Sequence, residues 1–306
     1  MSENRYSPIA VTAVLLAVLM WASSFALIKM GLDYLPPIGF AAIRFGIGAV
    51  IMVVVLFLRQ SPRESLREFR NDWKVLTFIG IIGLALPNAL LNVGLQFTTA
   101  SLSSIIQAAG PVFTLIFAVL LLGEGLGPDK ILGSIVAIIG TFLLIAQDGI
   151  DFSNSTFVGN LVVVLSSICY SLSGVATKVA LRKHNPVEIV GWMLIIGSIL
   201  LLLMATLEPG ASYQFDTQIV IVILFLAVFP GCLAFILYNW VLKTKEVSQL
   251  AFFIYLIPVF AIIISYLIIE EILPLQTFLL GGVVILGVAI AQYRLVSRLR
   301  GAPHEA

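Results

Sequence analysis

The sequence predicts an all-α membrane protein of ten transmembrane helices, arranged as two inverted five-helix repeats around a central cavity. Three observations predict it: the composition, the number of long apolar segments, and an internal repeat. Of the 306 residues, 60% are hydrophobic and 11% are charged, with a mean hydropathy of +1.10. Soluble domains carry about 25% charged residues because water covers their surface. Most of this surface therefore faces lipid, and a net charge of +1 without a basic stripe predicts no nucleic-acid partner.

Ten segments have the length and composition of membrane spans. An apolar helix needs about 20 residues to cross a hydrocarbon core of about 30 Å. Such segments lie at about 9–29, 37–58, 75–96, 101–122, 129–147, 157–181, 187–207, 217–241, 249–269 and 275–295. The lipid bilayer is therefore the first predicted partner of the chain.

The distribution of basic residues predicts the orientation of these spans, because Lys and Arg in short loops stay on the cytoplasmic side. With the N-terminus in the cytoplasm, all of the 17 cations except Lys29 and Arg44 fall on that side. The opposite loops carry acids such as Asp148 and Glu208. The sequence thus predicts a multi-pass protein of the cell membrane with both termini cytoplasmic.

An internal repeat divides the chain at about residue 150. The segment from Pro111 to Glu124 aligns with the segment from Pro258 to Glu271, at an offset of 147 residues. Earlier in each half the offset is 149 residues, and the matched pairs include Trp21 with Tyr170, Lys29 with Lys178 and Pro37 with Pro186. Each half holds five spans, an odd number, so the second half enters the membrane from the opposite side. Inverted repeats of this kind are typical of secondary transporters, which bind substrate near the midplane between the halves.

Four prolines lie inside predicted spans, two in each half: Pro87, Pro111, Pro230 and Pro258. Proline removes a backbone hydrogen bond and bends a helix. In lipid such breaks are tolerated beside protein or a wet cavity. Breaks in corresponding helices of the two halves indicate a transport site or gating elements. The alternative is that they are structural kinks without substrate contact.

Polar and aromatic side chains at membrane depth are the candidates for lining the cavity. They are Trp21, Arg44, Asn88, Asn92, Gln107, Tyr170, Tyr238, Asn239 and Tyr255. Apart from Arg44 they offer neutral hydrogen-bonding groups and aromatic faces, which suit an uncharged, zwitterionic or aromatic small molecule. The alternative is interhelical hydrogen bonding, worth about 0.6 kcal/mol per contact.

Three charged residues call for separate hypotheses. Arg44 has no counterpart in the second half, because Met193 occupies the repeat position. An arginine at membrane depth indicates function, so Arg44 either binds a substrate carboxylate or braces a gate, or else its side chain snorkels to the surface. Glu124 and Glu271 close the fourth and ninth spans, as gate-side ion pairs or as solvated helix ends.

The sequence predicts no catalytic residue, no metal site and no cofactor. An intramembrane enzyme needs a nucleophile with a base, or a metal site, at membrane depth. The two histidines, His184 and His304, fall in a loop and in the tail. A passive channel or facilitator for small polar solutes remains an alternative to a carrier. Small residues in the fifth and tenth spans, Gly133 with Ala137 and Gly287 with Ala291, serve scaffold or dimer contacts, in a monomer or a homodimer.

Several motifs together resemble those of a known family. They are Trp21-Ala-Ser-Ser-Phe, the Arg44-Phe pair, and the Pro-Val runs that end at Glu124 and Glu271. Their order and duplication over residues 9–295 resemble the EamA family of the drug/metabolite transporter superfamily. The resemblance implies two EamA-type repeats, 1–150 and 151–306 with a short cytoplasmic tail. It also implies a cavity lined by the first, third, fourth, sixth, eighth and ninth helices. The predicted function is a secondary transporter, an exporter of amino acids, their derivatives or other small metabolites, working by alternating access.

Overall fold

The structure, a computed structural model, describes residues 7–59, 61–122, 128–244, 250 and 253–291. Glu124 and the start of the ninth predicted span lie outside the described residues. Within them the chain forms helices and no strands. The helices are α1 (Pro8–Gly31), α2 (Pro37–Arg59), α3 (Pro62–Gly80), η1 (Ile81–Ala85), α4 (Leu86–Phe97), α5 (Ala100–Gln107), α6 (Gly110–Leu122), α7 (Pro128–Ile145), α8 (Ser155–Ala180), α9 (Pro186–Ala205), α10 (Thr217–Val228), η2 (Phe229–Leu233), α11 (Ala234–Thr244), α13 (Leu256–Ile269) and α14 (Leu275–Ala291).

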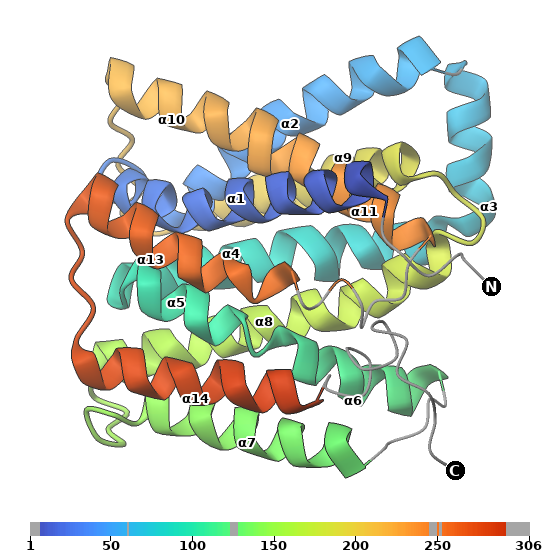
Figure 1. Ribbon diagram of the computed structural model, residues 1–306. Helices are drawn as coiled ribbons and strands as arrows, with labels where there is room; N and C mark the ends of the chain where they lie inside the picture. Colours follow the sequence, from blue (N-terminus) through green and yellow to red (C-terminus); the bar gives the residue numbers. More distant parts are fainter. Residues whose placement is uncertain (1–6, 60, 123–127, 245–249, 251–252, 292–306) are drawn as a thin grey trace, which may run out of the picture.

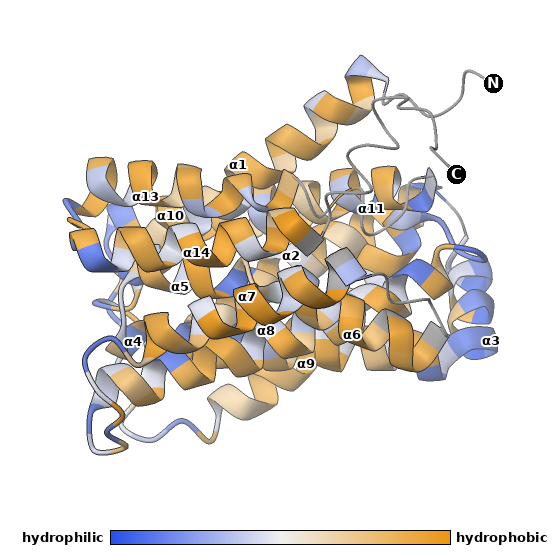
Figure 2. Ribbon diagram, turned by 60° about the horizontal axis from the view of Figure 1, so that its bottom comes forward, coloured by the Kyte–Doolittle hydropathy of each residue, from blue (hydrophilic) through white to orange (hydrophobic). Residues whose placement is uncertain are grey.

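Helix lengths and the surface composition agree with a membrane protein. In the described part of the chain, seven helical segments are long and apolar enough to cross a bilayer. Three shorter apolar helices cover Ile131–Ile145, Leu256–Ile269 and Leu275–Ile290. The bundle exposes large apolar side chains such as Leu120 and Leu267 along its flanks. Hydrophilic residues gather at its two ends, as Figure 2 shows.

The two halves of the chain run in opposite directions. Helices α3, η1 and α4 follow one another without a break, so Asp72 in α3 and Phe97 at the end of α4 lie at opposite ends of the bundle. Lys29 in the last turn of α1 bonds the end of α4, whereas Lys183 just after α8 bonds Asp72. Helices α1 and α8, the first of each half, are therefore antiparallel (Figure 1). We name the two ends of the bundle the Lys29 end and the Asp72 end.

The halves exchange their first helices. Helix α1 packs mainly on α11 and α13 of the second half, and α8 packs mainly on α4, α6 and α5 of the first half. The second helices, α2 and α9, pack on each other, and so do the fifth helices, α7 and α14. This exchange places Trp21 of α1 and Tyr170 of α8 at the contact between the halves.

The predicted helix breaks are present, but their geometry differs from a proline kink in the middle of a helix. Two five-residue π-helical turns, η1 and η2, interrupt the third helix of each half at matched positions. In the fourth helices, α5 ends at Gln107 before α6 begins, and Tyr255 lies in a turn just before α13. The four prolines lie in the first turns after or within these breaks: Pro87 in α4, Pro111 in α6, Pro230 in η2 and Pro258 in α13. At Pro111 and Pro258 the missing proline N–H costs little, because the first turn of a helix has N–H groups without helical partners. Pro87 and Pro230 instead lie in helical segments that continue through η1 and η2.

The breaks of the two fourth helices meet. Ala108 and Tyr255, 147 residues apart, lie in one small cluster of buried residues together with Val112, Ala137 and Val288. Because Ala108 and Tyr255 are repeat mates, this cluster lies close to the pseudo-symmetry axis between the halves. Tyr255, predicted to line the cavity, is thus packed against the opposite break.

Helices α7 and α14 pack at close range through their small residues, as the sequence predicts for a scaffold contact. A Cβ on Gly287 would lie 2.8 Å from the Ala137 Cα. We expect Gly287→Leu to destabilise the protein, because overpacking a close contact costs about 1–3 kcal/mol or more. Thermal unfolding in detergent measures this. Gly282→Leu, on the same helix with open space around its Cβ among the described residues, is the control; equal melting temperatures for the two variants would contradict the packing.

Candidate substrate site between the two halves

Arg44, Asn88 and Tyr170 form a polar cluster between the halves, which we call the polar triad; Arg44 and Asn88 are buried, and Tyr170 is partly buried. The Arg44 Nη2 donates to the Asn88 Oδ1 at 2.9 Å, and the Asn88 Nδ2 donates to the Leu84 carbonyl at 2.7 Å. The Tyr170 side chain lies close to the side chains of Asn88 and Arg44. Asn88 lies nine residues before the end of α4, about 14 Å at 1.5 Å per residue. The triad is therefore near the middle of the bundle.

The structure excludes one of the alternatives for Arg44. Its side chain is 3% exposed, so it does not snorkel to the surface. Its guanidinium lies 4.3 Å from the centre of the Phe45 ring. The Arg44 Nε has no hydrogen-bond partner, and within the described residues Arg44 forms no ion pair. A buried cation without a counter-ion is costly, which leaves Arg44 suited to binding an anion.

Trp21, Phe235 and Tyr238 form an aromatic cluster on the other side of the contact, which we call the aromatic triad. The Trp21 ring centre lies 5.3 Å from that of Phe235 and 5.2 Å from that of Tyr238. The Trp21 Nε1 donates to the Pro230 carbonyl at 3.3 Å, in η2. Because this N–H is the single polar group of the indole, the rest of the Trp21 ring and the Phe235 ring offer apolar surface, and Tyr238 adds one hydroxyl.

Hydrogen bonds from α8 hold the two breaks of the first half. The Gln107 Nε2 donates to the Ser166 Oγ at 2.9 Å, and Ser166 donates to the Pro87 carbonyl at 2.7 Å. The Ser171 Oγ donates to the Gly110 carbonyl at 2.8 Å. Gln107, predicted to line the cavity, is thus engaged between α5 and α8. The two serines were missed by the sequence analysis, since serine is common in membrane helices and nothing distinguishes these.

Asn92 and Asn239, which occupy matched positions of the repeat, are both buried, Asn92 in α4 and Asn239 in α11. Asn92 is on the same face of α4 as Asn88, and both contact α2: the Asn92 Nδ2 donates to the Pro37 carbonyl at 2.9 Å. The Asn92 Oδ1 is buried without a partner among the described residues. Asn239, its repeat mate in α11, is 4% exposed. Asn92 therefore joins α4 to the start of α2 rather than to the polar triad.

The repeat-matched lysines make the same contact in both halves. The Lys29 Nζ donates to the carbonyls of Leu95 and Thr98 at 2.7 and 2.9 Å. The Lys178 Nζ donates to the carbonyl of Leu242, the repeat mate of Leu95, at 2.6 Å. Cations at helix C-termini satisfy the last carbonyls and the helix dipole. In each half, the first helix is thus joined to the third helix, at the Lys29 end in one half and at the Asp72 end in the other.

Two glutamates bind helix N-termini at the Lys29 end. Glu271 accepts from the backbone N–H groups of Ala100 and Ser101, both at 2.8 Å, at the start of α5. Glu208 accepts from Ile38 and Gly39 at the start of α2, at 3.0 and 2.8 Å. Glu271 was predicted as an ion pair or a solvated end; the structure shows a cap. The sequence analysis missed Glu208 as a cap because nothing local marks a partner 170 residues away.

We expect Glu271→Gln to lower the stability of the Lys29 end by about 1 kcal/mol, because it removes a charged cap from α5. Thermal unfolding in detergent measures the change. Glu270→Gln is the matched control, since Glu270 is its exposed neighbour. An unchanged melting temperature for Glu271→Gln would show that the cap contributes nothing.

Acidic and basic residues also meet at the Asp72 end. The Lys183 Nζ and the His184 Nε2 each lie 3.1 Å from an Asp72 carboxylate oxygen, and the His184 Nδ1 lies 3.5 Å from Glu188. Asp72 has non-helical backbone angles inside α3. This cluster ties α3 to the turn between α8 and α9, and it lies apart from the polar triad.

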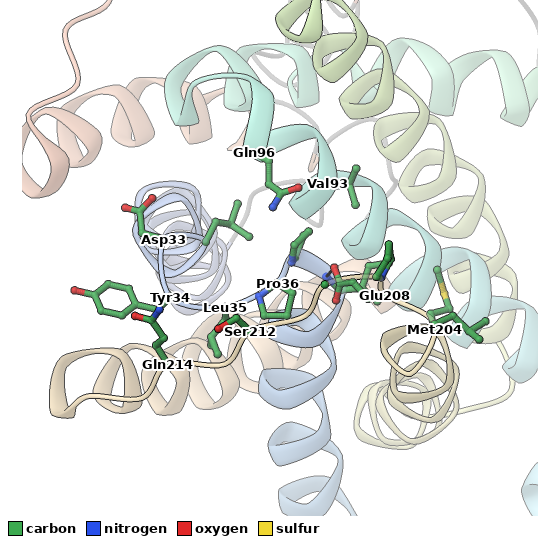
Figure 3. A pocket seen from close by; sticks show the side chains of 16 residues that line it. Asp33, Tyr34, Leu35, Pro36, Val93, Gln96, Met204, Glu208, Ser212 and Gln214 are labelled. Carbon is green, nitrogen blue, oxygen red and sulfur yellow. Dashed lines mark hydrogen bonds between the residues drawn. The ribbon is translucent and has the colours of Figure 1, made fainter.

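A surface depression at the Lys29 end differs from the predicted cavity. It has a volume of about 650 Å³ and is lined by the α1–α2 and α9–α10 connections and the end of α4. Figure 3 shows Asp33, Tyr34, Gln96 and Glu208 around it. It contains no residue of either triad, and its Glu208 carboxylate is already bonded to backbone. We therefore place the candidate substrate site at the two triads.

The all-helical fold, the apolar flanks and the exchanged halves define a multi-pass membrane transporter. Two segments, residues 8–146 and 157–293, match the model of the EamA-like transporter family. The chain belongs to this family.

Curated relatives agree with this family assignment, and a solved structure agrees with the fold. The uncharacterized transporter YyaM of Bacillus subtilis is 30% identical over 88% of both chains. A probable terminal-alkyne amino-acid exporter of Streptantibioticus cattleyicolor is 26% identical over 96% of both chains. A crystal structure with 22% identity superposes with a TM-score of 0.70, covering 95% of this chain and 98% of that one; it supports the fold.

Proposed function

We propose that the protein is a secondary transporter that exports small metabolites, such as amino acids or their derivatives, by alternating access. In this proposal ten helices span the cell membrane, with both termini in the cytoplasm. The repeats 1–150 and 151–306 enclose the substrate between them, and the chain works as a monomer or a homodimer. The relative named as an amino-acid exporter supports this substrate class and direction.

One observation carries the proposal: two antiparallel halves exchange their first helices around matched helix breaks. Inverted repeats give two nearly equivalent conformations, open to opposite sides, by rocking one unit against the other. The repeat-matched contacts of Lys29 and Lys178 lie at opposite ends of the bundle. Both contacts are formed in this structure, and in this proposal one of them breaks when its end of the bundle opens.

A comparison of metabolite and amino-acid export tests this proposal. Cells with the protein, without it, and with Arg44→Ala are grown at several external pH values, and the medium is analysed. We expect one or a few metabolites to accumulate outside faster with the wild-type protein alone. Identical media from all three strains would contradict export.

A further inference from the structure

Two members of each triad occupy matched positions in the two halves but differ in chemistry, whereas Tyr238 matches Leu91. The repeat offsets of 149 and 147 residues match Arg44 with Met193, Tyr170 with Trp21, and Asn88 with Phe235. Every member of the polar triad is thus replaced by an apolar or aromatic residue at the matched position. A symmetric scaffold therefore carries an asymmetric site.

The polar half of this site is prepared for an anion. Arg44 is buried, its Nε is unpartnered, and no carboxylate neutralises it within the described residues. Asn88 of α4 accepts a hydrogen bond from it, and Tyr170 of α8 lies close to it. The guanidinium fork binds planar carboxylates through two parallel hydrogen bonds.

The aromatic half lies next to it. Arg44 rests over the Phe45 ring, and the Phe45 Cε1 is 3.8 Å from where a Cβ on Gly231 would lie. Gly231 follows Pro230, whose carbonyl accepts from Trp21. Phe45 thus contacts Arg44 of the polar triad and lies near the η2 turn, to which Trp21 of the aromatic triad is bonded. A small molecule that contacts both triads is charged at one end and apolar at the other.

We propose that the substrate is an amphiphilic carboxylate, with its carboxylate at Arg44, Asn88 and Tyr170 and its apolar or aromatic part against Trp21, Phe235 and Tyr238. This inference rests on the proposed transport function and gives its substrate class. An amino acid with an aliphatic or aromatic side chain belongs to this class, and so does a simple arylalkyl or alkyl carboxylate. Organic cations, neutral polar solutes and polyanions do not.

Binding by the purified full-length protein in lipid nanodiscs tests the proposal through the shift in melting temperature. The ligands are L-phenylalanine, L-leucine, 3-phenylpropionate and 4-methylvalerate, with L-phenylalaninol, 2-phenylethylamine and acetate as matched compounds that lack either the carboxylate or the apolar part. We expect at least one of the four carboxylates to stabilise the wild-type protein, and to bind at least tenfold more tightly than its matched compound. No stabilisation by any of the four, or equal stabilisation by the matched compounds, would overturn the inference.

Variants locate the two ends of the ligand. Arg44→Gln is expected to weaken carboxylate binding at least tenfold, and Arg44→Lys by less, because it keeps the charge. Trp21→Leu is expected to weaken the binding of ligands with apolar tails. Trp240→Leu is the control, because Trp240 on α11 is 46% exposed, and it is expected to leave binding unchanged. Unaltered affinity in Arg44→Gln would contradict the carboxylate position; if this variant does not fold, the wild-type ligand series still decides.

Flux measurements separate this inference from the proposed function. If the protein transports cations or neutral solutes alone, with saturable flux, the substrate class is wrong but the transport function holds. If carboxylates bind but no flux is seen, the substrate class holds as a ligand class and the transport function is wrong.

Discussion

Replacing Arg44 by glutamine is expected to lower the transport efficiency, Vmax/KM, by a factor of about 30 to 1000. Hydrogen bonds to charged groups contribute about 1.5–3 kcal/mol each, and about 1.4 kcal/mol corresponds to a factor of ten. Arg44 is the buried cation of the polar triad, and its Nε is free to bond an anion. The loss therefore amounts to one or two such bonds to the substrate.

Initial rates in proteoliposomes measure this effect. Arg59→Gln is the matched control, because Arg59 ends the same helix and is exposed. Gel filtration in detergent checks that both variants fold. Normal flux through folded Arg44→Gln would exclude Arg44 from the substrate site and leave it a bracing role between α2 and α4.

Replacing Asn88 by aspartate is expected to stop transport nearly as completely, with almost no change in side-chain volume. The Asn88 Oδ1 lies 2.9 Å from the Arg44 Nη2, so the introduced carboxylate pairs with Arg44 directly. In a low-dielectric interior this internal anion neutralises the guanidinium and competes with the substrate carboxylate. We expect Vmax/KM to fall at least about 30-fold, or about 2 kcal/mol.

Flux assays on Asn88→Asp, Asn88→Ser and Gln96→Glu separate charge from shape. Gln96→Glu makes the same amide-to-carboxylate change on α4 at an exposed position and is expected to leave flux normal. Asn88→Ser removes the amide without adding charge and is expected to cost less than Asn88→Asp. An equal loss in Asn88→Ser and Asn88→Asp would show that the Asn88 amide matters for structure rather than for the charge of Arg44.

The all-helical fold and its repeat could be predicted because they depend on patterns that recur along the chain. Apolar segments of about 20 residues predicted the helices, and seven of the helical segments are long and apolar enough to span a membrane, whereas the count of ten spans stays a prediction. Two offsets of nearly constant length predicted two halves, and two segments of the chain match the family model. The exchange of α1 and α8 between the halves could not be predicted. It depends on which faces pack best in three dimensions, and the apolar composition of these helices is nearly uniform.

The candidate site was predicted in part. Arg44, Asn88 and Tyr170 were chosen as polar groups at membrane depth, and the structure brings these three together. Phe235 was missed, because phenylalanine in a membrane helix is usually a packing or lipid-facing residue. Its role emerges from its contact with Trp21 and its match to Asn88. Tyr255 and Asn92 were chosen by the same rule, but they contact the opposite helix break and the start of α2 instead.

The helix breaks show how an inverted repeat conserves geometry without conserving residues. Pro87 and Pro230 do not occupy matched positions, yet η1 and η2 do. A π-helical turn absorbs one extra residue in a helix, so a proline beside it or within it can produce the same break. Sequence comparison of the prolines alone indicates the helices that are broken but not the turn that breaks them.

Counterflow in proteoliposomes tests the central claim, that two antiparallel halves carry a bound substrate between two alternating states. Vesicles that contain the purified protein are loaded with the unlabelled metabolite found in the export comparison and are diluted into a trace of the labelled form. Alternating access predicts that label accumulates transiently inside the vesicles above its equilibrium level. This accumulation is expected to saturate with substrate concentration and to be lost in Arg44→Gln. Flux that rises in proportion to concentration, without accumulation of label, would contradict alternating access and indicate a channel.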